Sequence, residues 1–121
     1  MTKTQSAANT WGGWLRRFRL ELGLSQDRLA DQIVLLCAHM SDADEERFKQ
    51  LRLECPEALA GYEVSRFESG MRTPLRRSFH MLLIWALVEM GLSLDVKLAN
   101  QWLELGQQGW LTDREQSSLF G

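Results

Sequence analysis

The sequence predicts an all-α protein, a compact bundle of five to six helices. Apolar residues recur every three or four positions in several segments, which is the spacing of a helix with one buried face. Few segments alternate apolar and polar residues as strands do, and no two neighbouring segments carry the turn signals of a hairpin. Polar capping residues precede most of the periodic segments and glycines follow them, as at the two ends of helices.

A polar N-terminal tail, residues 1–10, precedes the first expected helix. The apolar stripe of that helix comprises Trp11, Trp14, Leu15, Phe18 and Leu22. Gly23 stops the helix, because its backbone tolerates the left-handed conformation that ends many helices. Ser25 is a suitable N-cap for a second helix, and Asp27 complements its positive end. We expect this second helix to continue to about Met40.

The middle of the chain contains a weaker helical segment and a stronger one. Residues 41–46 contain a capping serine and four acidic side chains, which indicates the start of a short helix. Pro56 suits the first turn of a helix, so that one interpretation places a helix over residues 57–69. In the other interpretation Gly61 breaks this span and the helix begins one residue later. Gly70 ends the helix in both interpretations.

Two further helices follow. The Thr73-Pro74 pair supplies a cap and a first helical position for a strongly apolar helix over residues 75–90, which Gly91 stops. Ser93 can cap a last long helix. The apolar residues of this last helix are Leu94, Leu98, Trp102 and Leu105. A final helical turn is expected near residues 113–119.

Length and composition place the chain among small globular proteins. With 121 residues and a hydrophobic fraction of 45%, it suits one packed domain and is too apolar for disorder. It has no run of about 18 apolar residues, so that we expect no membrane span. The N-terminal tail lacks the apolar core of a signal peptide, and we therefore expect a cytoplasmic protein.

The sequence carries no catalytic or metal-binding pattern. The two cysteines, Cys37 and Cys55, are too few for a disulfide framework and are expected to be buried or incidental thiols. Together with His39 or His80 they match no standard zinc spacing. A Ser-His-Asp set, a phosphate-binding glycine loop and an HExxH motif are all absent. We therefore expect a protein that is not an enzyme and needs no cofactor.

Charge is distributed unevenly along the chain. The net charge of −2 argues weakly against a nucleic-acid binder. However, residues 11–34 sum to +1 and residues 59–80 to +2, whereas residues 35–58 and 81–121 each sum to −3. A localised basic face, rather than a basic average, is what binding to nucleic acid requires.

The two positive segments contain the most specific motifs. Leu22-Gly23-Leu24-Ser25-Gln26-Asp27-Arg28-Leu29-Ala30 opens the second helix, and Val64-Ser65-Arg66-Phe67-Glu68-Ser69-Gly70 ends a later one. With Arg72-Thr73-Pro74 and the apolar helix after it, they resemble the Cro/repressor helix-turn-helix family, also called XRE-like. The resemblance covers residues 14–34 and 59–90. It implies a lambda-repressor-like fold and a bacterial, phage or plasmid context.

The resemblance assigns DNA contacts to both motif helices. In such folds the first motif helix lies across the DNA backbone, which implies that Gln26 meets a phosphate or base edge with Ser25 as the cap beside it. The second motif helix enters the major groove, where Arg66 can pair bidentately with guanine. Val64 and Phe67 face inward. The positions expected to face DNA are Gly61, Tyr62, Glu63, Ser65 and Arg66 in the groove, and Arg72, Arg76 and Arg77 at phosphates.

The family also implies an ion pair. An arginine late in its first helix often pairs with the glutamate just before the Ser/Asn-Gly turn. The matching residues here are Arg19 and Glu68. We expect a partly buried pair that ties the first helix to the groove helix.

The chain departs from the family in the length of the turn between the motif helices. Residues 35–58 stand where the family has a tight turn. Such an insert costs little loop entropy, but it can move the groove helix. Because this insert is acidic, we expect it to point away from DNA or to meet a partner protein. Gly61 stands where the family often has a base-reading side chain, so that specificity rests on Tyr62 and Arg66.

The sequence divides into residues 11–91 as the helix-turn-helix domain and residues 92–121 as a C-terminal helical extension. The extension has more large apolar residues than one small core needs, which suggests a protein interface. A two-fold dimer would set its recognition helices about 34 Å apart on a palindromic operator. In the alternative, the last helix packs onto its own domain. The residues expected at the dimer interface are Leu94, Leu98, Trp102, Leu105 and Trp110.

Several side chains have two interpretations. Four arginines are either solvated helix faces or phosphate contacts, and the motif favours the second reading. They are Arg16, Arg17, Arg76 and Arg77. Tyr62 is either a half-buried aromatic or a base contact. Trp11, Trp14 and Phe18 are expected in the core rather than in a platform for stacked bases.

The sequence therefore predicts a homodimer that binds specific duplex DNA and represses or otherwise regulates transcription. The rival is a protein-interaction adaptor or antitoxin-like regulator with weak or no DNA binding, which the acidic balance and the insert favour. A positive stripe joining Gln26, Arg66, Arg72 and Arg76 would support DNA binding. An acidic insert covering Tyr62 and Arg66 would support the adaptor.

Overall fold

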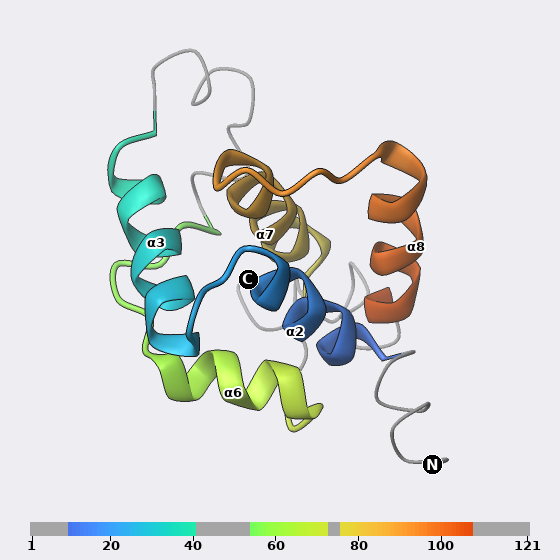
Figure 1. Ribbon diagram of the computed structural model, residues 1–121, viewed down its shortest axis with the longest axis horizontal. Helices are drawn as coiled ribbons and strands as arrows, with labels where there is room; N and C mark the ends of the chain where they lie inside the picture. The colour runs from blue at the N-terminus through green and yellow to red at the C-terminus, as the bar shows by residue number, and fades with distance from the viewer. Residues whose placement is uncertain (1–9, 41–53, 73–75, 108–121) are drawn as a thin grey trace, which may run out of the picture.

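Residues 10–40, 54–72 and 76–107 are described by a computed structural model of the protein. Its helices are α2 (Trp11–Glu21), α3 (Gln26–Ala38), α6 (Gly61–Ser69), α7 (Arg77–Glu89) and α8 (Val96–Gly106) (Figure 1). These ranges contain no strand, in agreement with the all-α prediction. Residues 1–9 of the predicted tail, the short helix after Met40, the Thr73-Pro74 pair and the final turn near residues 113–119 lie outside the described residues. α7 begins at Arg77 with Arg76 as its N-cap, so that the predicted start at residue 75 with Thr73 as the cap is wrong.

The helices are arranged around α7. In Figure 1, α3 and α8 lie on opposite sides of α7, α2 crosses in front of it, and α6 lies beneath α2 and α3. The contacts between elements agree with this view, because α6 packs on both α2 and α3, while α8 packs on α2 and α7. The two motif helices α3 and α6 are therefore neighbours in space, although the insert separates them in sequence.

Most predicted helix ends are present. The Ser25 hydroxyl accepts the Arg28 N–H at 3.1 Å and caps α3. Gly23 and Gly70 follow α2 and α6 with φ of 70° and 83°, the left-handed conformation expected of a glycine stop. α3 ends at Ala38, two residues before the predicted end. α6 begins at Gly61 rather than at residue 57, close to the second of the two interpretations.

The last helix begins later than predicted. Asp95, not Ser93, is its N-cap, and the Asp95 carboxylate accepts the Leu98 N–H at 2.7 Å. Leu94 therefore precedes α8 and packs against the core from the connecting segment. Serine and aspartate are about equally good caps, so that the residue type alone does not choose between the two positions.

An aromatic cluster forms the part of the core where α2, α7 and α8 meet. Trp11 stacks on Trp102 with ring centroids 5.4 Å apart, and the Trp102 indole N–H donates to the Trp11 carbonyl at 3.0 Å. Phe18 packs edge-on against Trp102 at 5.1 Å. The prediction that Trp102 lies at a dimer interface is wrong, because this side chain is fully buried within its own chain.

His80 is buried in the same cluster. The Trp11 indole N–H donates to the His80 Nε2 at 2.7 Å, and the His80 ring lies edge-on to Trp102 at 4.5 Å. Burial, and to a lesser degree the positive charge of Arg77, lowers the pKa of His80 from 6.5 to about 3. The imidazole is therefore neutral at pH 7, as its acceptor role requires. His80 was considered from the sequence only as a possible metal ligand, and the pattern did not indicate that it accepts a hydrogen bond within the core.

Candidate nucleic-acid interface

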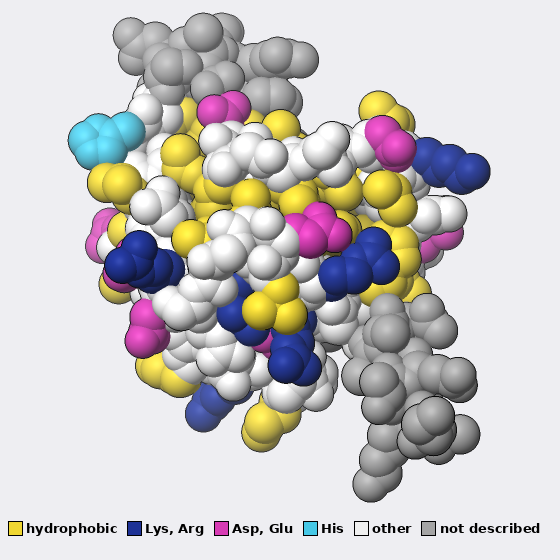
Figure 2. Space-filling model, in the orientation of Figure 1, with side chains coloured by type: hydrophobic (Ala, Val, Ile, Leu, Met, Phe, Trp, Pro, Cys, Tyr) yellow, Lys and Arg dark blue, Asp and Glu magenta, His cyan; other side chains and the backbone are white. Residues whose placement is uncertain are grey.

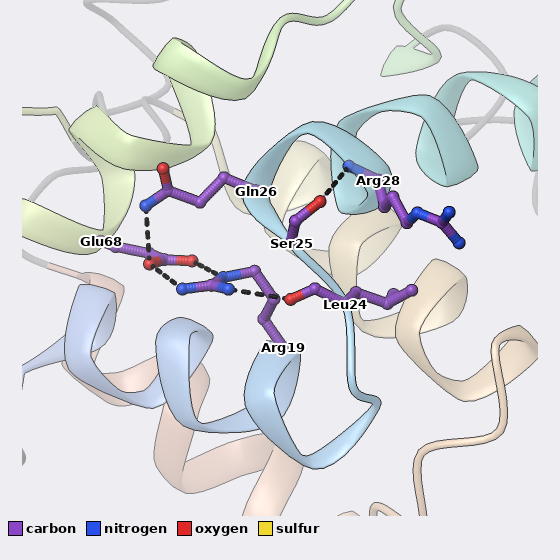
Figure 3. Close-up of polar contacts among 6 residues, drawn as sticks. All are labelled: Arg19, Leu24, Ser25, Gln26, Arg28 and Glu68. Atoms are coloured by element: carbon purple, nitrogen blue, oxygen red, sulfur yellow. Dashed lines mark hydrogen bonds and ion pairs between the residues drawn. The ribbon is translucent and has the colours of Figure 1, made fainter.

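The predicted ion pair between Arg19 of α2 and Glu68 of α6 is present. Arg19 Nε donates to Glu68 Oε2 at 2.6 Å, and Arg19 Nη2 donates to Glu68 Oε1 at 3.0 Å (Figure 3). Both side chains are largely buried, with 10% and 5% of their surface exposed. Two parallel charge-assisted hydrogen bonds with little solvent fix the relative position of α2 and α6.

The same carboxylate also holds the start of α3. The Gln26 side-chain amide donates to Glu68 Oε1 at 3.2 Å, and Arg19 Nη1 donates to the Leu24 carbonyl at 2.8 Å (Figure 3). Glu68 thus joins the first helical residue of one motif fragment to the end of the other. This contact uses one N–H of the Gln26 amide, so that its second N–H and its carbonyl oxygen are not bonded to Glu68.

The first turn of α3 borders this network and is open to solvent. Ser25 and Arg28 are exposed, and the Ser25 hydroxyl caps the Arg28 amide (Figure 3). The N-terminus of a helix carries unsatisfied amides and a partial positive charge, which favour a nearby anion. Asp27, also exposed, contributes a negative charge in the same turn.

α6 has one buried face and one exposed face. Val64 and Phe67 are buried, as predicted, and fix the helix on the core. On the opposite side Tyr62 is 62% exposed, and the Arg66 guanidinium lies over its ring at 5.5 Å from the centroid. Ser65 is half-buried between these faces. Tyr62 is therefore a surface aromatic and not a core residue.

Two predicted groove positions are not on the exposed face of α6. Gly61 is buried, because α3 approaches it so closely that a Cβ there would overlap the Asp27 carboxylate. The prediction that Gly61 faces DNA is therefore wrong. Glu63 is half-buried and turned back, since its carboxylate accepts the Ala60 N–H at 2.9 Å. Glycine at this position serves the close approach of two helices rather than the readout of bases.

The arginines after α6 differ in their partners. Arg72 is 55% exposed in its side chain, lies 3.8 Å from the Glu63 carboxylate and places its guanidinium over Phe67 at 5.4 Å. Arg77 is exposed at the start of α7. Arg76, predicted at a phosphate, instead donates to Glu54 Oε2 at 2.8 Å.

Glu54, at the end of the insert, is a nearly buried carboxylate. It also accepts the Ser78 hydroxyl at 2.9 Å, and its side chain is 8% exposed. These bonds attach the end of the insert to the first turn of α7. The charge of Arg76 is thereby matched within the chain, which makes it a weaker candidate for a phosphate contact than Arg77.

Charge on the visible face is mixed. In Figure 2, Lys and Arg side chains are spread over the region where α2 and α6 lie, with Asp and Glu side chains among them. A continuous positive stripe is not visible from this side. Arg28 of α3 and Arg66 of α6 are both exposed.

The residues predicted at a dimer interface are only partly exposed. Leu94 and Leu98 are half-buried, and Leu105 is 38% exposed. Trp110 lies outside the described residues. The exposed apolar surface of α8 is thus smaller than its sequence suggests, because α8 uses part of its apolar stripe to pack on α2 and α7.

Other functional features are sparse in the described part of the chain. No group of three or more His, Cys, Asp or Glu side chains is placed to hold a metal ion there. Cys37 is buried and Cys55 is half-buried. None of the described helices is both long and apolar enough to cross a membrane.

The chain matches no known protein family, no curated protein and no solved structure.

Proposed function

We propose that this protein binds duplex DNA at specific sequences and thereby represses or otherwise regulates transcription. The proposed DNA surface comprises Ser25, Gln26, Tyr62, Ser65, Arg66, Arg72 and Arg77. One observation carries the proposal: the carboxylate of Glu68 bonds both Arg19 and Gln26, which joins the two motif fragments across the insert. Beside this junction, Tyr62 and Arg66 remain exposed.

The proposed contacts follow from the two motif helices. The exposed face of α6 enters the major groove, whose width admits one helix, and Arg66 reads a base edge there. The first turn of α3 faces the sugar-phosphate backbone with its amides and Ser25. Arg72 and Arg77 add phosphate contacts that hold the register without reading sequence.

The proposal includes a two-fold homodimer. A dimer presents two copies of α6 to successive major grooves about 34 Å apart and favours a palindromic operator. The exposed part of α8, with Leu105 at 38% and Val96 at 77% exposure, is the surface we propose for this contact.

Binding titrations test the proposal. Fluorescence anisotropy of a labelled random-sequence duplex, measured at 50 and 200 mM salt, should show binding that weakens steeply with salt, because arginines displace phosphate counterions. Unlabelled duplexes enriched by selection should compete better than random ones. A chain that binds no duplex at 50 mM salt contradicts the proposal.

A protein-interaction adaptor is the second candidate, and two carboxylates favour it. Asp27 lies against Gly61 at the start of α6, where a negative charge repels phosphate. Glu54 already occupies Arg76. An adaptor of this kind would show no dependence of duplex binding on sequence and no selected consensus, which separates it from the regulator in the same titrations.

A further inference from the structure

Arg66 differs in its partner from Arg19, Arg72 and Arg76. Arg19, Arg72 and Arg76 lie 2.6, 3.8 and 2.8 Å from glutamate carboxylates. Within the ranges that the structure describes, Arg66 has no such ion pair, and its guanidinium rests instead on the ring of Tyr62. The donors of Arg66 are therefore not committed to a carboxylate of the described residues.

Helix geometry fixes this pair. Tyr62 and Arg66 are four residues apart and so lie on the same face of α6, one turn from each other. The burial of Val64 and Phe67 holds the helix in the rotation that turns this face outward. Tyr62 is 62% exposed, so that it contributes little to the core, and its cation–π partner Arg66 is exposed as well.

A cation–π contact leaves the donors of a guanidinium available. The ring attracts the charge of the group, whereas the N–H donors of arginine lie in its plane and stay available to other acceptors. An in-plane pair of donors matches two adjacent acceptors, and guanine offers such a pair, O6 and N7, in the major groove. Restricting the rotamers of Arg66 before binding reduces the entropy lost on binding.

We propose that Tyr62 is a positioning residue that holds Arg66 for the readout of guanine in the major groove. This inference rests on the proposed function and adds to it that Arg66 contacts guanine and that Tyr62 orients Arg66. Tyr62 acts through Arg66, so that its removal lowers the preference for guanine more than it lowers binding to DNA in general.

Selection from a random-sequence duplex pool provides the first test, with the wild-type full chain and three variants. The wild type should enrich guanine at a fixed position, and Arg66→Ala should lose that enrichment. Tyr62→Ala should lower the preference for guanine about two- to fivefold, which is the size of an exposed cation–π contact. Tyr62→Phe keeps the ring and should therefore retain the preference for guanine that Tyr62→Ala loses. Because Tyr62 is on the surface, thermal unfolding should be unchanged in both Tyr62 variants.

Base analogues in the selected duplex provide the second test. Replacing the guanine by 7-deazaguanine removes the N7 acceptor and should weaken wild-type binding about fivefold or more, but should leave Arg66→Ala unaffected. Inosine keeps O6 and N7 and lacks only the minor-groove amino group, so it should bind as guanine does. A phosphate contact by Arg66 would respond to neither analogue.

The outcomes separate the two claims. If the wild type enriches a sequence but Tyr62→Ala keeps the full preference for guanine, or if 7-deazaguanine has no effect, the positioning role is wrong and the proposed function stands. If the wild type enriches no sequence at all, the proposed function fails and this inference fails with it.

Discussion

Arg19 and Glu68 are 49 positions apart and form an ion pair through two hydrogen bonds of 2.6 and 3.0 Å. Glu68 accepts a further bond from Gln26. One carboxylate of α6 therefore holds both the end of α2 and the start of α3. The relative position of the two motif helices depends on this junction rather than on a short turn between them.

Removing one member of this pair should destabilise the fold strongly. Arg19→Gln or Glu68→Gln leaves the other charge nearly buried without its partner, which costs about 3–5 kcal/mol of unfolding free energy. Replacing both residues by leucine should cost less, because no unpaired charge remains. Urea unfolding followed by circular dichroism measures these differences.

Arg17 provides the matched control. It lies 4.0 Å from Glu21 on the surface of the same helix, with more than half of each side chain exposed. Arg17→Gln should change the unfolding free energy by less than about 1 kcal/mol. Equal effects of Arg17→Gln and Arg19→Gln would refute the structural role assigned to Arg19.

His80 should make the protein less stable in mild acid. Its pKa is 6.5 in the unfolded chain and about 3 in the folded one. Well above pH 6.5 the His80 ring is uncharged in both the folded and the unfolded state. Between pH 6.5 and 3 the ring binds a proton in the unfolded state but not in the folded state. Stability therefore falls as the pH falls through this window, by about 1–2 kcal/mol between pH 6.5 and 5.

The pH dependence of the unfolding free energy should be lost when residue 80 has no ionisable side chain. His80→Asn removes the ionisable ring, so its unfolding free energy should lack this contribution between pH 6.5 and 5. His39 is exposed and serves as the control, and His39→Gln should keep the wild-type dependence. A His80→Asn variant with the wild-type slope would show that another group causes it.

Two glycines at helix crossings should respond differently to alanine. At Gly12 a Cβ would overlap the Phe67 carbonyl, which belongs to the backbone of α6 and cannot turn aside, so Gly12→Ala should destabilise by about 1–3 kcal/mol. At Gly61 the overlap is with the Asp27 side chain. Adding Asp27→Ala should therefore recover stability lost in Gly61→Ala. Urea unfolding of all three variants tests this, and a Gly12→Ala protein as stable as the wild type speaks against the packing described.

Arg77 should contribute to DNA affinity without contributing to sequence preference. Because its contact is with phosphate, Arg77→Ala should weaken specific and random duplexes alike and reduce the slope of log affinity against log salt by about 1. Lys97→Ala on α8 makes the same change in net charge outside the proposed surface and should leave the slope intact. Anisotropy titrations at several salt concentrations measure both slopes, and the assignment is rejected if the two variants give the same one.

Local features of the fold were predictable from sequence because they depend on residues close together in the chain. The Ser25 cap needs only its neighbours, and the stops at Gly23 and Gly70 follow from the backbone freedom of glycine. The pairing of Arg19 with Glu68 was accessible for a different reason, since a resemblance to a helix-turn-helix family supplied the long-range match that spacing alone does not.

Features that depend on which surfaces meet were not predictable. An apolar stripe indicates that Trp102 is buried, but it does not say whether the same chain or a second copy covers it. The position of Gly61 on its helix indicated a contact with DNA, whereas the close approach of Asp27 to Gly61 decides its role. His80 is polar, and its burial is accompanied by a hydrogen bond from the indole of Trp11, 69 positions away in the sequence. In each case the deciding neighbour is far away in sequence.

The most direct test of the central claim is to map the DNA surface by NMR, following the backbone amides of the full chain during titration with a selected duplex. We expect resonance changes to concentrate at Ser25 and Gln26 of the α3 start and at Tyr62 and Arg66 of α6, with α8 little affected. Changes confined to α8 or α7, with Gln26 and Arg66 unmoved at saturating duplex, would contradict that claim.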